Sequence, residues 1–132
     1  MSFLLDTNVI SAYLRRPASL AHRFDQYAGR LYLPTIVLSE LCVAPWRLAD
    51  PGPMLAAIET LVRDEVTVLD FDAGCATVFG RVRGERLNAG VSLPLMDLLI
   101  GSVGLAHDLT VVTHNTNNFA LIPGLRVVDW LD

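Results

Sequence analysis

Hydrophobic and polar positions divide the chain into two kinds of segment. Short apolar runs without helical spacing predict buried strands, and they lie at residues 3–5, 31–33, 66–69, 110–113 and 126–128. Between them, apolar residues recur every three or four positions, as on one face of a helix. These helical segments are residues 8–16, a stretch closed by Gly29, 35–44, 55–62, 72–88 and 95–106. Strands that alternate with helices predict an α/β fold with a short, mostly parallel sheet of about five strands.

Turn and capping residues set the expected boundaries. Pro17 should stop the first helix, and Asn8, Thr35 and Asp72 are the expected N-caps of the helices that they open. Residues 114–124 carry no periodic pattern and predict a loop. The chain shows no internal repeat, linker or low-complexity segment, so residues 1–132 are expected to form a single domain.

Composition is that of a globular protein, with 52% hydrophobic and 18% charged residues. No apolar run approaches about 18 residues, so no membrane span is expected. The start of the chain lacks the basic leader and apolar region of a signal peptide. Cys42 and Cys75 match no metal-ligand spacing, which favours reduced thiols in a cytoplasmic protein over a disulfide.

Three carboxylates interrupt apolar patterns. Asp6 ends the first strand, Glu40 lies beside the buried face of the helix after residue 35, and Asp97 lies in the first turns of an almost wholly apolar helix. Burial of a lone carboxylate costs several kcal/mol unless a cation or hydrogen bonds compensate. The chain contains no lysine to pair with them. Taken singly, each acid is more simply a cap or a surface residue.

Taken together, the three acids suggest a metal site. Asp6 follows a strand at the carboxyl edge of the expected sheet, where open parallel sheets bind their ligands. Several carboxylates brought to that edge would form a hard, oxygen-rich site suited to Mg²⁺ or Mn²⁺. Such a site serves phosphoryl chemistry, because the ion lowers the pKa of bound water and neutralises charge on the phosphate.

Four motifs in order resemble the signature of PIN-domain nucleases. They are Asp6-Thr7-Asn8 after the first strand, Ser39-Glu40-Leu41, the run from Pro94 to Ile100 that contains Asp97, and the tail from Thr113 to Phe119 followed by Pro123-Gly124-Leu125 and Asp129-Trp130. The tail is similar to the C-terminal end of bacterial VapC-type toxins. The resemblance covers nearly the whole chain and implies a PIN-like three-layer α/β/α fold.

The resemblance implies a function as well. It implies a Mg²⁺- or Mn²⁺-dependent endoribonuclease, the toxin of a type II toxin–antitoxin pair, with Asp6, Glu40 and Asp97 as catalytic, metal-binding acids. The implied partners are RNA and a VapB-like antitoxin, and the implied assembly is a homodimer or a hetero-oligomer with the antitoxin.

The chain departs from the family pattern near its end. Many PIN domains have a fourth acid where this chain has Asn115, and Asn118 stands where a second Asp often precedes the Phe. Either asparagine is a candidate to hold the metal ligands in place or to act as a fourth ligand. Thr7 and Asn8 are expected to support the metal ligands, and Asn8 serves equally well as a helix cap.

The sequence offers weaker signals for RNA and protein contacts. Arg83 and Arg86 are neighbours on one helix face and are candidates for RNA binding, although a solvated face is the simpler interpretation. Arg81 points away from them and is expected to pair with Glu85. His114 is left out of the catalytic set because a loop histidine is more often merely exposed. Net charge is −4, and all ten basic residues are arginines, which suit bidentate phosphate contacts.

Alternative functions remain at this point. A haloacid-dehalogenase-like phosphatase also places an Asp after its first strand, but its chemistry needs a second acid two residues later, where this chain has Asn8. A binding module that keeps the fold without cleavage is the main alternative. Trp46 is expected to point away from the core, either into a partner or onto the following helix.

Overall fold

The structure is a computed structural model that describes residues 1–15 and 17–131. Its centre is a five-stranded sheet in the order β3-β2-β1-β4-β5, and every neighbouring pair is parallel. The strands are β1 (Phe3–Leu5), β2 (Leu31–Pro34), β3 (Thr67–Leu69), β4 (Thr110–Val112) and β5 (Val127–Val128). The predicted α/β class and parallel sheet are therefore confirmed.

Seven α-helices connect the strands within the described residues. They are α1 (Thr7–Arg15), α2 (Pro17–Gln26), α3 (Thr35–Leu41), α4 (Gly52–Thr60), α5 (Ala73–Asn88), α6 (Leu95–Ala106) and α7 (Thr116–Phe119). A 3₁₀ turn, Ala44–Arg47, follows α3, and a π-helical turn, Leu61–Glu65, extends α4. No helix of the described chain is long and apolar enough to cross a membrane.

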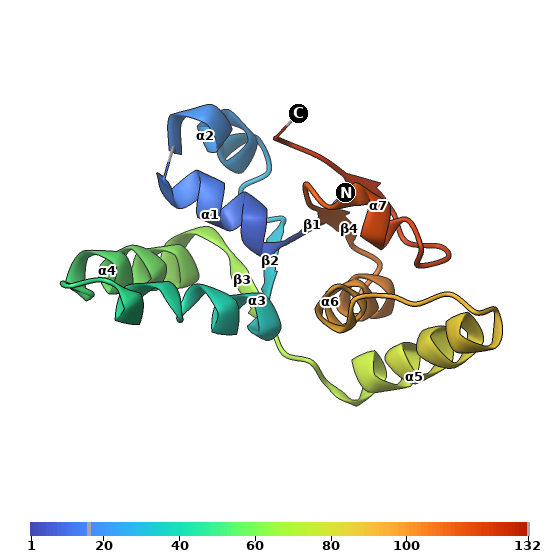
Figure 1. The fold of residues 1–132 in the computed structure, drawn as a ribbon. Helices are drawn as coiled ribbons and strands as arrows, with labels where there is room; N and C mark the ends of the chain where they lie inside the picture. The colour runs from blue at the N-terminus through green and yellow to red at the C-terminus, as the bar shows by residue number, and fades with distance from the viewer. Residues whose placement is uncertain (16, 132) are drawn as a thin grey trace.

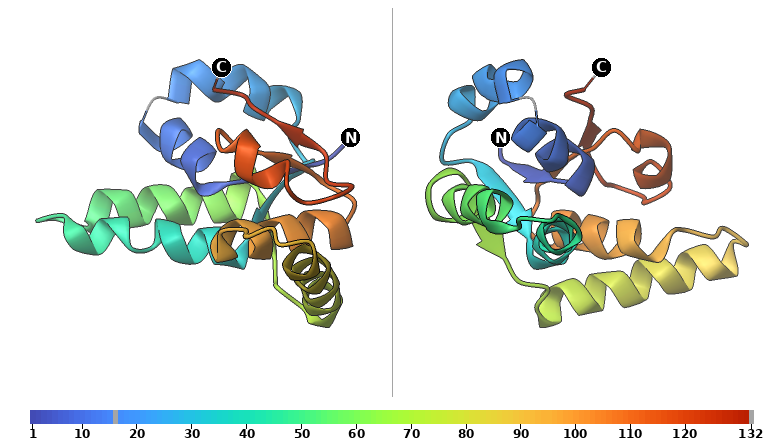
Figure 2. Two further views of the ribbon diagram at one scale, coloured as in Figure 1. Left: turned by 45° about the vertical axis from the view of Figure 1, so that its right-hand side comes forward. Right: turned by 60° about the vertical axis from the view of Figure 1, so that its left-hand side comes forward.

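Helices cover both faces of the sheet, as the parallel topology requires. Figure 1 shows α1 and α2 on one side of the central strands and α6 on the other. Figure 2 shows α5 beneath α6, on the side away from α1 and α2. The strands β1 and β4 are buried along their whole length, so the core lies on both faces of the central pair.

The middle of α6 approaches the C-terminal segment closely. A Cβ atom on Gly101 would overlap Cδ1 of Ile122, and one on Gly104 would lie 3.0 Å from Cγ2 of Val111. Glycine at both positions lets the helix backbone pack directly on these side chains. The two ends of α6 are thereby held at defined places beside the sheet.

Several predicted boundaries were wrong. Asn8 is not a cap, because α1 begins at Thr7 and the first helical N–H groups point to Asp6. Thr35 makes no side-chain cap either, since it is the first residue of α3. The predicted loop 114–124 contains α7, a single turn too short to show periodicity. Asp72 does cap α5, through a 3.0 Å bond to the Cys75 N–H. The predicted end of the first helix at Arg16 lies outside the described residues.

Candidate metal centre

Asp6 is the most enclosed member of the candidate site. Strand β1 is buried along its length, and Asp6, which follows it directly, is only 4% exposed. Its Oδ1 accepts a 2.7 Å hydrogen bond from the Thr7 N–H, and its Oδ2 accepts a 2.7 Å bond from the Thr113 hydroxyl. Thr113 follows β4 as Asp6 follows β1, so neighbouring parallel strands bring the two residues together.

Burial raises the pKa of Asp6 above its ordinary value. The hydrogen bonds from Thr113 and Thr7 oppose this rise, whereas the negative charges of Asp97 and Glu40 add to it. The carboxylate is thus held in place by neutral donors that do not cancel its charge. Such a group favours a nearby cation.

Glu40 and Asp97 face the same cleft from other elements. Glu40 lies on α3, and its Oε1 accepts a 2.7 Å bond from the Thr7 hydroxyl. Asp97 lies in the first turn of α6, and its Oδ2 accepts a 3.0 Å bond from the Asn118 side-chain amide. The cleft has a volume of about 380 Å³ and is lined by Asp6, Thr7, Asn8, Ser11, Arg15, Glu40, Met96, Asp97 and Asn115. The structure therefore brings the three sequence-selected acids to one cleft at the carboxyl edge of the sheet.

The two asparagines of the tail occupy different places around this cleft. Asn115 lines it, and the Asn115 N–H donates a 2.9 Å bond to the Thr113 hydroxyl. Asn118 lies one turn further on α7 and donates to Asp97. A carboxylate at position 118 would place two negative charges against each other, whereas the amide makes a hydrogen bond.

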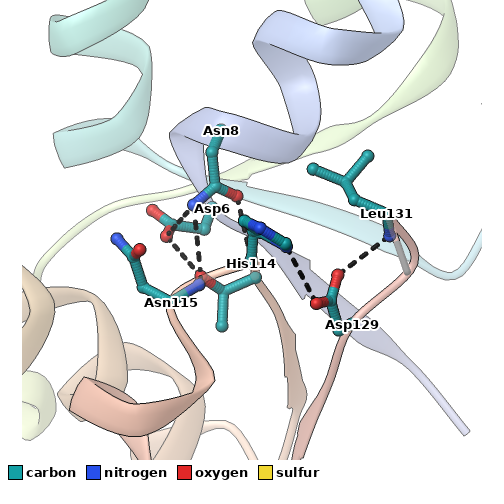
Figure 3. Close-up of polar contacts among 7 residues, drawn as sticks. Asp6, Asn8, His114, Asn115, Asp129 and Leu131 are labelled. Carbon is teal, nitrogen blue, oxygen red and sulfur yellow. Dashed lines mark hydrogen bonds and ion pairs between the residues drawn. The ribbon is translucent and has the colours of Figure 1, made fainter.

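A hydrogen-bonded chain extends from Asp6 through Asn8 and His114 to Asp129 (Figure 3). The Asn8 amide nitrogen lies 3.4 Å from both Asp6 Oδ2 and Thr113 Oγ1, and the Asn8 oxygen accepts a 3.2 Å bond from the His114 N–H. The His114 ring in turn bonds Asp129 through Nδ1, at 2.9 Å. Asn8 therefore connects Asp6 to His114, and the bond to Asp129 fixes the orientation of the His114 ring.

The donor set fits a hard divalent cation. Carboxylate and amide oxygens are the ligands that Mg²⁺ and Mn²⁺ prefer, and the cleft offers three carboxylates with the Asn115 side chain beside them. Within residues 1–15 and 17–131, no arginine or histidine forms an ion pair with any of the three acids. Arg15 also lines the cleft, at the far end of α1 from Asp6, and adds positive charge to its wall.

A sequence profile of the PIN domain family matches residues 3–125. This chain belongs to the PIN domain family. It is 34% identical over 131 residues to the tRNA(fMet)-specific endonuclease VapC of Shigella flexneri, and the match covers 98% of both proteins.

Solved structures of PIN domains share the same fold. The crystal structure of DNA-bound VapBC from Salmonella typhimurium has a TM-score of 0.91 and 30% identity, and the match covers 98% of each chain. VapBC2 from Rickettsia felis, bound to a DNA fragment from their promoter, has a TM-score of 0.88 and 26% identity over 98% of this chain and 99% of that one. These matches confirm the PIN-like fold that the four sequence motifs predicted.

Other residues selected from the sequence of this PIN domain lie outside the cleft. Arg83 and Arg86 line a separate pocket of about 200 Å³ beside the start of α6, and Nε of Arg86 is buried without a hydrogen-bond partner in the described chain. Arg81 pairs with Glu85 at 3.7 Å, as predicted. Trp46 lies in the 3₁₀ turn after α3 and is 70% exposed.

Sequence reasoning missed three residues of the site. Thr113 and Arg15 were not selected, although Thr113 shares with Asp6 the position directly after a buried strand, which is a usable signal. Asp129 also went unnoticed as a partner of His114, because 15 residues separate the two and no local pattern connects them.

Proposed function

We propose that this chain is a Mg²⁺- or Mn²⁺-dependent endoribonuclease, the cytoplasmic toxin of a type II toxin–antitoxin pair. The observation that carries the proposal is the convergence of Asp6, Glu40 and Asp97 on one cleft, where no arginine of the described residues forms an ion pair with any of them. Its relative from Shigella flexneri, named as an endonuclease, supports the nuclease activity. Asp6, Glu40 and Asp97 would hold the ion, with Asn115 beside them.

When bound, the ion would lower the pKa of a water molecule for attack on the phosphodiester and neutralise charge on the phosphate. The chain's own residues prepare this site in advance. Thr113 and the Thr7 N–H fix the Asp6 carboxylate, and the Thr7 hydroxyl fixes Glu40. Fixed ligands keep the reacting groups in a productive geometry, which is a large part of catalytic power.

Three arginines would bind the RNA backbone. Arg15 lines the cleft itself, and Arg83 and Arg86 line the pocket next to the start of α6, the helix that carries Asp97. A guanidinium group binds phosphate oxygens through two parallel hydrogen bonds. We assign the three residues to substrate binding rather than to the chemical step.

Cleavage of RNA by the purified chain tests the enzyme against a binding module that only keeps the fold. End-labelled RNA should be cut with Mg²⁺ or Mn²⁺ and left intact with EDTA. Initiator tRNA is the first substrate to examine, with elongator methionine tRNA as its control, because the Shigella relative is named for tRNA(fMet). Retention of RNA without cleavage, at any metal concentration, would favour the binding module.

The surface after α3 is the proposed contact for the antitoxin. The neighbouring structures from Salmonella and Rickettsia are VapBC complexes, and this chain exposes Val43, Trp46 and Leu48 in one short segment. Large exposed apolar residues of this kind are typical of interface anchors. The Trp46→Ala variant should weaken antitoxin binding by about 2 kcal/mol without slowing RNA cleavage, as measured by calorimetry and by the cleavage assay. Unchanged affinity and assembly state would place the interface elsewhere.

A further inference from the structure

A second cluster of ligand-type side chains lies at the opposite end of α6 from Asp97. It consists of Asp72, the N-cap of α5, Cys75, in the first turn of that helix, and His107, the residue after α6. His107 lies ten positions after Asp97, which is about 15 Å along the axis at the helical rise. The cluster is therefore distinct from the acid cleft.

The three side chains present one potential ligand atom each to a common point. The carboxylate oxygen, the thiol sulfur and the imidazole nitrogen all lie within 4.8 Å of one another. Ligand atoms around a tetrahedral zinc ion are roughly 3.5 Å apart, given the usual zinc–sulfur and zinc–nitrogen bond lengths. Asp72 and His107 are exposed, and the His107 ring can turn toward the Asp72 carboxylate while that carboxylate keeps its cap bond, so a movement of about 1 Å would close the site.

We infer that Asp72, Cys75 and His107 form a second metal site, which binds one Zn²⁺ ion and joins the start of α5 to the end of α6. Thiolate and imidazole ligands select zinc over Mg²⁺ or Mn²⁺, which prefer oxygen. Three protein ligands leave a fourth tetrahedral position for water. His107 also lines a surface pocket of about 570 Å³, so its ring is open to solvent.

The surrounding charges suit this ion. The N-terminal end of α5 stabilises the negative charge of a bound thiolate and carboxylate, and the C-terminal end of α6 favours a cation beside His107. Cys75 is fully buried, and burial raises the pKa of its thiol, so the metal-free residue is a neutral thiol. Binding of zinc forms the sulfur–zinc bond and releases the thiol proton to solvent.

The cluster also has a structural consequence. α5 is the outer helix on this side of the molecule, and it packs on α6 rather than on the sheet (Figure 2). A zinc ion at one end of this helix pair would fix α5 at the end opposite Arg83 and Arg86. Those two arginines line a pocket near the start of α6 that is separate from the acid cleft.

Cobalt spectroscopy on the full chain tests the site, because a cobalt–thiolate bond absorbs in the near ultraviolet and an all-oxygen cobalt site does not. Titration of the purified protein with Co²⁺ should produce this band at one equivalent, and Zn²⁺ should displace it. The Cys75→Ala variant should lose the band. The matched Cys42→Ala variant should keep it, since Cys42 lies outside the cluster.

If Cys75→Ala fails to fold, substitutions at the two exposed residues of the cluster still test the site. The His107→Gln variant should weaken Zn²⁺ binding by about tenfold or more, whereas His22→Gln, at another exposed histidine, should not. Asp72→Asn keeps a good N-cap residue and should weaken zinc binding in the same way. Absence of the thiolate band in the parent chain, its survival in Cys75→Ala, or equal zinc affinity in His107→Gln and His22→Gln would each overturn the inference.

Discussion

The two ends of α6 carry metal-ligand chemistry of opposite kinds. At its start, Asp97 joins Asp6 and Glu40 in a cleft of hard oxygen donors at the carboxyl edge of the sheet. At its end, His107 meets Asp72 and the buried thiol of Cys75. The first set suits Mg²⁺ or Mn²⁺ and the second suits Zn²⁺. One helix thus presents two sites that the choice of ion should separate.

The difference lies in how each set is supported. Neutral donors hold the acids of the cleft, namely Thr113 and Thr7 on Asp6, Thr7 on Glu40 and Asn118 on Asp97. In the other cluster, the Asp72 carboxylate already bonds the Cys75 N–H as a helix cap, and the described contacts include no partner for the His107 ring. Hydrogen bonds therefore fix the orientation of each acid in the cleft, whereas the second cluster depends on the proximity of its three ligand atoms, which lie within 4.8 Å of one another.

The largest expected effect is at the start of α6. Asp97→Asn should reduce RNA cleavage by about a hundredfold to a thousandfold, because it would remove a charged ligand from the proposed metal ion, which would stabilise the transition state. The metal-free fold should not be weakened, since the change also removes a negative charge that raises the pKa of Asp6. Cleavage rates and melting curves without metal measure both effects. A clear fall in melting temperature would make Asp97 a structural residue, and Asp70→Asn, at an exposed site outside the cleft, is the control.

Thermal melts of two variants, each measured with two different ions, should distinguish the two metal sites. At about one hundred times its Kd, an ion that binds only the folded chain adds about 2.7 kcal/mol to the free energy of unfolding, or roughly 10 °C in Tm for a chain of this size. Mn²⁺ should stabilise His107→Gln as it does the parent and stabilise Asp97→Asn much less. Zn²⁺, added with excess Mg²⁺ to occupy the cleft, should stabilise Asp97→Asn as it does the parent and stabilise His107→Gln much less. If one variant loses the response to both ions, the two sites are not independent.

The sequence predicted the acid cleft but not the second cluster of Asp72, Cys75 and His107, because only the acids stand out in their own segments. Asp6, Glu40 and Asp97 each interrupt an apolar pattern, so a single carboxylate is conspicuous in its own segment. Asp72 and Cys75 are fully explained as the cap and a buried residue of one helix, and His107 is an ordinary residue at the end of another. None of the three therefore stands out in the sequence. Their proximity depends on the antiparallel packing of α5 on α6, which no local pattern records.

The fold shows the same limit. Strands and long helices follow from periodicity, and their order gave the α/β class. The wrong prediction of a cap at Asn8 shows that periodicity carries no information on long-range contacts. Asn8 bonds Asp6, Thr113 and His114, and the last two are more than a hundred residues away in sequence. Such a long-range network outweighs the local preference of asparagine for a cap.

The middle of α6 determines where both of its ends lie. Gly101→Ala should lower the free energy of unfolding by about 1 kcal/mol, because the overlap with Ile122 costs about 1–3 kcal/mol and the better helix former returns about 1 kcal/mol. Gly84→Ala in α5 has no atom within 4 Å of the added Cβ and should instead stabilise the chain by up to about 1 kcal/mol. Urea melts of the two variants compare them directly. Equal stabilisation by both changes would mean that α6 is free to shift at its centre.

The smallest expected effect concerns the acid that this chain lacks. Asn118 donates a 3.0 Å hydrogen bond to Asp97, so Asn118→Asp replaces an attraction with the repulsion of two carboxylates. Water screens the pair, because both residues are only partly buried, and the metal-free fold should lose a few tenths to about 1 kcal/mol. With Mn²⁺ the sign should reverse, since a further carboxylate near a divalent ion attracts it where an amide offers only a dipole.

A substitution that lowers the stability of the fold without Mn²⁺ and raises it with Mn²⁺ identifies a position that belongs to the metal site. Asn117→Asp adds the same charge at the neighbouring, exposed residue and should change the melting curve little in either condition. Asn115→Asp should resemble Asn118→Asp, because Asn115 lines the cleft. If only one of the two follows this pattern, that position is where a fourth acid would act. If both behave like Asn117→Asp, the site works with three acids, and the oxygen-rich end of α6 is complete without its asparagines.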